Sequence, residues 1–362
     1  MHIIFLTIGT FSQNAMMKRV KGLAPHIIAA GHQVTIVLED TDENREYFSS
    51  VEAEKAFFSG SGIVQEIRQK VRMIRNRSPD VVYACGWGLR NGAALMGNTS
   101  IIEHAEMLSS FPSAERGTIL RGKDYLMEWI SITCADGLVL ASEYLFRNYQ
   151  NNYLSRDNKM LRLPYGLEGS KVTGKGGIEK KEVTRVVYMG TLRASYGIFD
   201  IVDSVPHLLD AGDPVEYMIL GDGPERKEAI ARAQSLGVKE YIRFEGYVSE
   251  DVLEERLASA DVFLAPMFDT VKDKARCPSK IPMYMRYQKP IVSCRVGEVP
   301  TYLAEDGYYY APGEPKSMAK QILKAAQVRT PINYDIEKFR WKQLSKKFIT
   351  WLDKEIDPQQ HD

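Results

Sequence analysis

The feature that most constrains this chain is an alternation of strand-like and helix-like segments that runs through its first half and then starts again. The first unit joins a strand at Ile3–Ile8, a helix with apolar residues at helical spacing between Met16 and Ile28, and a strand at Gln33–Leu38. Two strands connected in this way form a parallel pair with a right-handed crossover. Continued alternation predicts a doubly wound α/β architecture.

The alternation divides the chain into two halves. In the first half we expect further helices at 63–77, 125–135 and from residue 142, and strands at 81–84, 100–103, 137–141 and 160–163. In the second half we expect strands at 185–189, 216–220, 242–245, 262–265 and 291–294. A chain of 362 residues is also longer than one hydrophobic core usually supports. The sequence therefore predicts two Rossmann-like domains.

The junction is expected in a segment that is rich in Gly, Lys and Glu and nearly lacks large apolar side chains. We predict an N-terminal domain at 1–167, a linker at 168–184 and a C-terminal domain at 185–337. The last segment, 338–362, places Trp341, Leu344, Phe348 and Leu352 on one face of a helix. This helix is expected to pack back on the N-terminal domain.

Composition argues against several classes of function. Lys+Arg and Asp+Glu both number 47, so no net charge draws the chain to nucleic acid. The four cysteines are far apart and form no C-x-x-C pair, which indicates neither a zinc site nor a disulfide framework. No secretory signal pattern or long uncharged apolar run is present. We expect a cytoplasmic protein whose membrane contact, if it has any, is peripheral at the inner face.

Short motifs narrow the class further. In the first half they are AGHQVT at 30–35, SPDVVY at 78–83, ADGLV at 135–139 with Ser142-Glu143, and LPYG at 163–166. In the second half they are YMGTL at 188–192, GDGP at 221–224, FEGYV at 244–248, ADVFLAP at 260–266, PSK at 278–280, KPIV at 289–292 and Gly297-Glu298. In this order the motifs resemble those of the group 1 glycosyltransferases, family 4.

The resemblance implies a GT-B fold, in which two Rossmann-like domains face a cleft. It also implies a transfer that retains the configuration at the anomeric carbon, needs no metal and uses no cofactor besides the nucleotide-sugar donor, a UDP- or GDP-sugar. The C-terminal domain would hold the donor and the N-terminal domain the acceptor, a glycan, a glycolipid or another hydroxyl compound. Ligands of doubly wound folds bind beyond the carboxyl ends of the strands. Assembly of a surface polysaccharide or glycoconjugate would be the biological setting.

The expected donor site combines a cation with backbone N–H groups, because negative charge builds on the leaving diphosphate. Ser279 and Lys280 match the family's P-S-K pattern, with Ser279 as the expected helix cap and Lys280 as the charge. Gly190 permits close approach of a ligand, and Arg193 could clamp a phosphate. The remaining candidates for donor contact come from the matching loop motifs: Gly9, Thr10, Thr191, Gly221, Gly246 and Tyr247.

Two departures from the family's pattern affect this site. Many relatives have Arg after the glycine of the first loop and a Lys-Gly pair a few residues later, where this chain has Thr191 and Tyr196-Gly197. Arg193 either substitutes for the missing charge or is a solvated loop residue. Relatives also carry an E-x7-E pair whose second Glu bonds the donor ribose. Those positions hold Ala275 and Met283 here, and a thioether is a weak acceptor.

Candidates for catalysis lie in the N-terminal half. His104 ends a strand where relatives carry a histidine beside the reacting sugar, and Glu103 could accept a proton. A lone histidine after a strand is, however, often structural. Trp87 could stack on a sugar or simply pack in the core. A basic run lies on one helix and would suit an anionic lipid surface, although an ordinary amphipathic surface helix is the favoured explanation; its residues are Arg68, Lys70, Arg72, Arg75 and Arg77.

Two other functions compete with sugar transfer. The loss of the E-x7-E acids and of the Lys-Gly lysine would suit a catalytically silent glycosyltransferase-like subunit that supports an active partner. A sugar-nucleotide epimerase has the same two-domain architecture, but the P-S-K and G-D-G-P motifs favour the transferase. The sequence does not specify the donor sugar, the acceptor or the oligomeric state.

Overall fold

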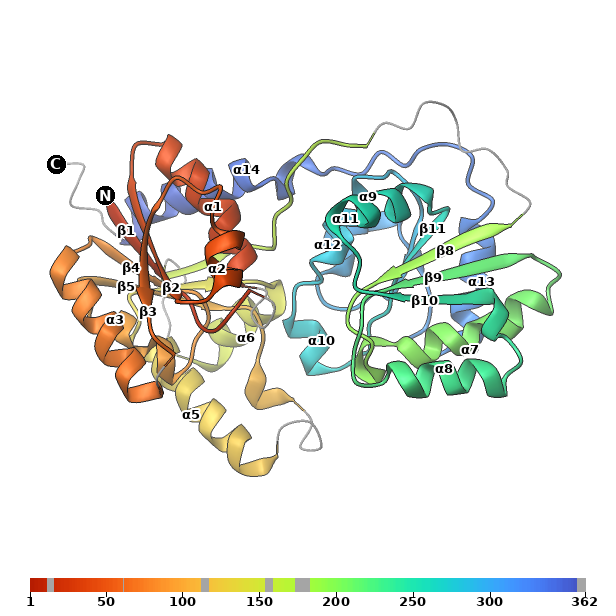
Figure 1. The fold of residues 1–362 in the computed structure, drawn as a ribbon, viewed down its shortest axis with the longest axis horizontal. Helices are drawn as coiled ribbons and strands as arrows, with labels where there is room; N and C mark the ends of the chain where they lie inside the picture. Colours follow the sequence, from red (N-terminus) through yellow and green to blue (C-terminus); the bar gives the residue numbers. More distant parts are fainter. Residues whose placement is uncertain (12–15, 61, 112–116, 154–158, 173–182, 357–362) are drawn as a thin grey trace. The chain divides into compact units, whose positions relative to one another are not determined.

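The computed structural model describes residues 1–11, 16–60, 62–111, 117–153, 159–172 and 183–356, and it divides the chain into two compact units (Figure 1). Unit 1 comprises Met1–Glu168, Lys274–Cys277 and Glu337–Asp362, and unit 2 comprises Gly169–Asp273 and Pro278–Ile336. Most of the expected linker, residues 173–182, lies outside the described residues. Both units are α/β with parallel sheets, which confirms the predicted fold class.

The sheet of unit 1 is parallel throughout and has the order β3-β2-β1-β4-β5-β6-β7. Its strands are β1 (His2–Leu6), β2 (Gln33–Glu39), β3 (Glu54–Phe58), β4 (Val81–Ala84), β5 (Thr99–His104), β6 (Gly137–Leu140) and β7 (Met160–Arg162). The helices are α1 (Met17–Ala29), α2 (Asp42–Tyr47), α3 (Ile63–Arg77), α5 (Thr118–Cys134), α6 (Glu143–Asn152) and α14 (Trp341–Trp351). Short 3₁₀ segments include η1 (Leu89–Met96) and η2 (Leu108–Ser110).

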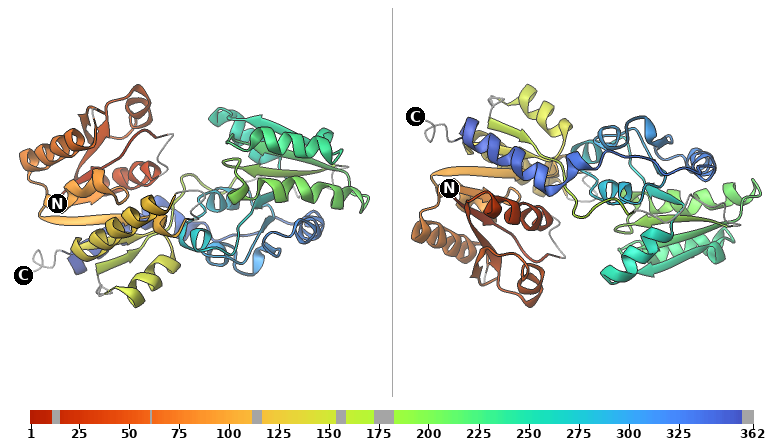
Figure 2. Two further views of the ribbon diagram at one scale, coloured as in Figure 1. Left: turned by 90° about the horizontal axis from the view of Figure 1, so that it is seen from below. Right: turned by 90° about the horizontal axis from the view of Figure 1, so that it is seen from above.

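One core of unit 1 lies between the sheet and the layer formed by α3, η1, α5 and α6. Alternate strand residues such as Ile4, Val82 and Ile102 supply its sheet side, and Ile74 of α3 and Ile132 of α5 supply the helix side. Period-2 alternation along the strands and helical spacing on the helices place these residues together. The other face of the sheet carries α1 and α14, which lie side by side (Figure 2).

Helix α14 closes this second face although it comes from the far end of the sequence. The indole of Trp341 lies so close to Gly22 of α1 and to Gly166 that an added Cβ would sit 2.3 and 2.5 Å from its ring. Phe348 packs its ring edge-on against Tyr83, with the centroids 5.7 Å apart. Gly22 and Gly166 are therefore required by contact with α14.

Unit 2 has a parallel sheet of order β10-β9-β8-β11-β12-β13. Its strands are β8 (Thr184–Met189), β9 (Val215–Leu220), β10 (Ile242–Gly246), β11 (Val262–Ala265), β12 (Ile291–Ser293) and β13 (Tyr308–Tyr309). Its helices are α7 (Ile198–Leu209), α8 (Arg226–Ser235), α9 (Glu250–Ser259), α10 (Val271–Ala275, whose last two residues belong to unit 1), α11 (Lys280–Met285), α12 (Val299–Leu303) and α13 (Pro315–Ala325).

Several elements differ from the sequence-based expectation. The sequence pattern missed β3, α2 and η1, and it placed the start of α5 at residue 125 rather than at Thr118. The early turns of α5 were missed because their buried residues are polar, including Asp124, so the apolar positions follow no inward-facing period. Within the described part of the chain, no helix is both long and apolar enough to cross a bilayer.

Candidate donor site

Three glycine loops meet at the carboxyl ends of neighbouring strands in unit 2. Gly190 follows β8 and donates its N–H to Leu220 O at 2.9 Å, while Gly221 donates to Gly246 O at 2.7 Å. A Cβ on Gly221 would lie 2.3 Å from Gly190 O, and Gly221 has a φ of 123°. Only glycine fits such an approach of two backbones. The three predicted residues Gly190, Gly221 and Gly246 are thus brought together.

The ammonium group of Lys280 lies directly beside Gly190. Lys280 Nζ is 2.7 Å from the position that a Cβ on Gly190 would take, and 4.1 Å from the centroid of the Tyr188 ring. Tyr188 donates its hydroxyl to Thr191 O at 3.0 Å, which orients the loop after β8. A half-buried ammonium group beside the backbone at the end of a strand suits an anionic ligand.

The other residues of unit 2 that were predicted to contact the donor differ in their exposure. Thr191, Arg193 and Ser279 are exposed, and Tyr247 is 82% exposed. Met283 is half-buried and follows Lys280 by three residues in α11, so both lie on one side of that helix. The expected cap is wrong, since Ser279 has helical backbone angles and makes no side-chain cap hydrogen bond.

Two cations near these loops escaped the sequence analysis. Lys272 is 6% exposed, donates to Ser195 Oγ at 3.0 Å and lies 5.1 Å from the centroid of the Tyr196 ring. Tyr196 stands where relatives carry the Lys-Gly lysine, so Lys272 brings positive charge to that loop from another segment. No local motif marks Lys272. Arg226 donates to Phe244 O at 3.0 Å close to Gly246, and its place after the GDGP turn could have identified it.

In unit 1, the first loop is tied to α2. Asn44 donates to Gly9 O at 3.1 Å and accepts from the Phe11 N–H at 3.1 Å. The Phe11 ring stacks on Tyr47 with the centroids 3.7 Å apart. Gly9 has a φ of 67°, which favours glycine at this turn. Gly9 and Thr10 therefore sit in a loop that is held in place at the carboxyl end of β1.

His104 lies inside unit 1, and both of its ring nitrogens are hydrogen-bonded. Its side chain is 0% exposed, with Nδ1 2.8 Å from Tyr149 Oη and Nε2 2.9 Å from Ser131 Oγ. Ser131 donates its one hydroxyl proton to Glu128 O, so it accepts from Nε2–H. Tyr149 then donates to Nδ1. These contacts favour a structural role for His104 over a catalytic one.

Glu103 is also fully engaged. Its carboxylate accepts from Arg19 Nε at 2.7 Å and from Tyr83 Oη at 3.0 Å, and both charged side chains are 0% exposed. Arg19 further donates to Pro164 O at 3.1 Å, which connects α1, β5 and the segment after β7. A carboxylate held in this way stabilises unit 1 and has no access to a substrate proton. We therefore assign Glu103 to structure.

Burial lowers the pKa of His104 from 6.5 to about 3, and this shift predicts a dependence of stability on pH. The unfolded chain binds the proton below pH 6.5 and the folded chain does not, so stability is retained above pH 6.5 and falls as the pH drops toward 3. Between pH 7 and 5 the loss should be roughly 2 kcal/mol.

The measurement is urea unfolding at both pH values, for the wild type and for His104→Gln, which does not titrate. All four tryptophans, Trp87, Trp129, Trp341 and Trp351, belong to unit 1, so their fluorescence reports on that unit alone. The variant should lose less stability between the two pH values than the wild type. Equal losses would contradict a neutral buried His104.

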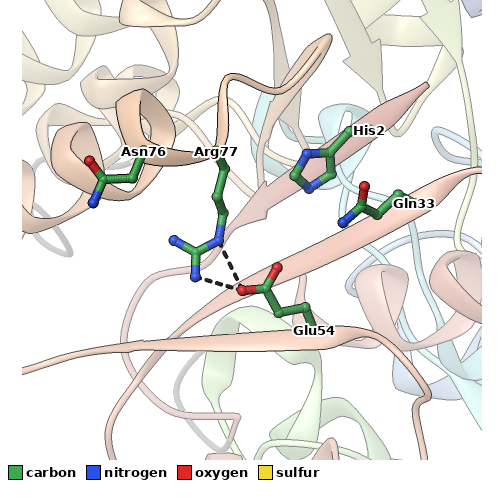
Figure 3. A pocket seen from close by; sticks show the side chains of 5 residues that line it. All are labelled: His2, Gln33, Glu54, Asn76 and Arg77. Carbon is green, nitrogen blue, oxygen red and sulfur yellow. Dashed lines mark hydrogen bonds and ion pairs between the residues drawn. The ribbon is translucent and has the colours of Figure 1, made fainter.

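Two hollows in the described part of unit 1 are poorly suited to a sugar-nucleotide ligand. Trp87, whose ring stacks on His104 with centroids 5.7 Å apart, lines a cavity of about 20 Å³ together with Ser131, which is enough for a single water. An open hollow lined by His2, Gln33, Glu54, Asn76 and Arg77 lies at the amino ends of the strands, where Arg77 pairs with Glu54 (Figure 3). It is at the edge opposite to the one where doubly wound folds bind ligands.

Comparison with known proteins agrees with this geometry. Residues 183–327 match the family model "Glycosyl transferases group 1". A stretch of 79 residues, 22% of this chain and 20% of the relative, is 28% identical to 2-deoxystreptamine glucosyltransferase of Streptomyces kanamyceticus. The chain thus matches only about a fifth of the length of that relative.

Solved structures match over nearly the whole chain. HepE of Anabaena in complex with UDP and glucose has a TM-score of 0.69 at 15% identity, with 99% of this chain and 96% of HepE covered. The lipopolysaccharide outer core galactosyltransferase WaaB has a TM-score of 0.69 at 15% identity, with 98% and 99% covered. TarM of S. aureus has a TM-score of 0.70 at 8% identity, with 99% and 97% covered.

The fold and the cluster of glycine loops around Lys280 therefore define a GT-B protein. The resemblance to the group 1 glycosyltransferases is confirmed, and the match to that family model lies in residues 183–327.

Proposed function

We propose that this protein is a retaining, metal-independent glycosyltransferase that moves a sugar from a UDP- or GDP-sugar to the hydroxyl of a glycan, glycolipid or lipid-linked acceptor. Assembly of a surface polysaccharide or glycoconjugate is the proposed setting, at the inner face of a membrane. The observation that carries the proposal is the Lys280 ammonium held beside Gly190, at the meeting point of the β8, β9 and β10 loops.

Each group in this site has a proposed task. Lys280 neutralises the charge that develops on the leaving diphosphate, and the backbone of Gly190 and Thr191 lets the phosphates approach closely. Arg193 and Lys272 add positive charge along the loop after β8. Gly221, Gly246 and Tyr247 border the nucleotide, and Gly9 and Thr10 of unit 1 remain proposed ligand-contact residues.

The comparisons support a nucleotide-sugar donor. HepE has been solved with UDP and glucose and also with UDP-glucose, and WaaB is described as a galactosyltransferase. Both share the fold of this chain. The resemblance to the group 1 glycosyltransferases supports retention at the anomeric carbon.

A catalytically silent subunit is the second candidate, because two positions lack the acidic residues of the family's pattern. Met283 stands where relatives bond the donor ribose, and Ala275 at the first acidic position is buried with its carbonyl accepting from Ser142 Oγ at 2.6 Å. Neither side chain can bind a ribose hydroxyl as a carboxylate does.

Nucleotide binding separates the two candidates. A ligand that binds only the folded state raises the apparent stability by RT ln(1 + [L]/Kd), so a thermal-shift series with UDP, GDP, ADP, CMP and dTDP should single out the donor nucleotide. We expect a response to UDP or GDP. A flat response to all five would favour the silent subunit.

The variant Met283→Glu sharpens this test. In the family pose, the new carboxylate would accept a charge-assisted hydrogen bond from the ribose, worth roughly 1.5 to 3 kcal/mol before its desolvation is subtracted. Affinity for the nucleotide should rise or hold, as measured by titration calorimetry. Should Met283→Glu instead abolish a measured wild-type activity, the donor lies in a different pose and the site residues must be reassigned.

A further inference from the structure

Helix α5 turns three polar side chains to the interior of unit 1 and several large apolar ones to the surface. Asp124, Glu128 and Ser131 are only 6%, 1% and 4% exposed. The exposed side of the helix is apolar and aromatic: Ile119 (89%), Leu120 (51%), Tyr125 (58%), Leu126 (54%) and Trp129 (48%). An ordinary surface helix has the opposite arrangement.

The inward polar groups fix this orientation. Glu128 accepts from the Ser109 N–H at 3.2 Å and from the Ser109 hydroxyl, which holds η2 against α5. Ser131 bonds His104 at the end of β5. Burial raises the pKa of Glu128, and the hydrogen bonds from Ser109 offset this effect only in part. Rotation of α5 to hide its apolar side would break these bonds, so the exposed apolar side is part of the fold.

Neighbouring elements extend this surface. On η1, Leu89 is 45% and Met96 57% exposed, and in the first turn of α3, Val64 is 62% exposed. Segment η1 contacts both α3 and α5, and all three cover the same face of the unit 1 sheet (Figure 2). We call the outer sides of α3, η1 and α5 the α3–α5 face. Exposed apolar side chains gathered in this way mark a docking surface.

The charge on the α3–α5 face has one sign. The acidic residues of the three elements, Glu66, Asp124 and Glu128, are all buried. Four basic residues, Arg68, Arg72, Arg75 and Lys123, are exposed. The chain as a whole has no net charge, so the exposed positive charge of this face differs from the charge balance of the whole chain. Two copies joined symmetrically through the face would bring like charges together.

We propose that the α3–α5 face docks on an anionic lipid bilayer. Tyr125 and Trp129 suit the headgroup level, as aromatic residues do at membrane interfaces. Ile119, Leu120 and Leu126 enter the boundary of the acyl chains, and the arginines of α3 meet the lipid phosphates. The proposal rests on the proposed function in one respect: a lipid-linked acceptor would lie in the same bilayer.

The test is co-sedimentation of the full chain with vesicles of phosphatidylcholine alone or of phosphatidylcholine with phosphatidylglycerol, without any donor. We expect binding to the anionic vesicles that weakens with added salt. Changing Arg68, Arg72 and Arg75 to Gln should lower the partition coefficient about 100-fold, at about fivefold for each basic group. The double variant Ile119→Glu, Leu126→Glu should lower it at least about tenfold through lost apolar contact.

Matched controls come from unit 2. Lys316, Lys320 and Lys324 are three exposed basic residues on α13, and Leu236 is a 43% exposed apolar residue. Changing the three lysines to Gln, or Leu236 to Glu, should leave vesicle binding unchanged. All changed side chains are exposed, and an unaltered Tm in each variant verifies folding.

Three results would overturn the proposal. The first is a wild type that does not bind anionic vesicles. The second is an equal loss of vesicle binding in the test and control variants. The third is a dimer in sedimentation velocity that the double variant Ile119→Glu, Leu126→Glu dissociates, with no lipid binding. The assay is independent of catalysis. A nucleotide response without vesicle binding rejects the docking face alone, and vesicle binding without any nucleotide response rejects the donor site alone.

Discussion

Replacing Lys280 with Ala should lower kcat/KM for sugar transfer by about 10²- to 10³-fold, the loss usual for one group that stabilises transition-state charge. The physical reason is the position of the ammonium beside Gly190, where a diphosphate leaving group can approach the backbone. The lysine contributes little to folding, because it is only partly buried. The thermal midpoint should therefore change little.

The measurement is steady-state kinetics with the nucleotide sugar identified by the thermal-shift series. Lys320→Ala on α13 is the matched control, since it removes an exposed lysine of unit 2 far along the chain from α11. It should retain wild-type kcat/KM. If Lys280→Ala retains it too, Lys280 does not contact the leaving group and the donor site must be sought elsewhere.

The largest effect on stability is expected from Arg19→Met. Arg19 and Glu103 form an ion pair with both side chains 0% exposed, and removing one partner leaves an uncompensated charge in the interior. Such losses cost about 3 to 5 kcal/mol. The same substitution removes the hydrogen bond to the Pro164 carbonyl and leaves Glu103 with the hydrogen bond from Tyr83.

Tryptophan fluorescence during urea unfolding of unit 1 measures this loss. Arg77→Met is the matched control, because Arg77 pairs with Glu54 at 2.6 Å on the surface, with side chains 26% and 44% exposed. Such a pair is worth at most about 1 kcal/mol. The double variant Arg19→Met, Glu103→Leu should regain part of the stability. If Arg19→Met lowered the free energy of unfolding no more than Arg77→Met does, the buried ion pair would stabilise the fold no more than the surface pair.

The sequence predicted the fold through features that repeat along the chain. The β-to-α alternation gave both sheets, and helix α3 and strands β4 and β11 have the expected bounds. Local pattern was sufficient for these elements, because each buries one side or both in the way its periodicity indicates. The inverted helix α5 violates that assumption, and its first turns were therefore missed.

The candidate site was predictable only where a motif and its loop coincide. Gly190, Gly221 and Lys280 come from recognisable motifs, and the structure brings them to one edge of the sheet. Lys272 reaches the loop after β8 from a distant segment, so only tertiary structure could identify it. For His104 and Glu103, the sequence motif predicted a role beside the substrate. In the structure both side chains are instead hydrogen-bonded within unit 1.

The packing of Trp341 against Gly22 and Gly166 has a consequence for how the chain is made. Unit 1 is discontinuous, and its last helix follows residue 336, after the whole of unit 2. At ordinary translation rates of about 5 to 20 residues per second, the sheet of unit 1 waits roughly 10 to 40 s for the helix that covers it. Unit 2 begins later in the sequence, but it is complete at Ile336, before α14 of unit 1 has been made. During synthesis, the apolar surface under α14 is therefore exposed to chaperones for longer than any surface of unit 2.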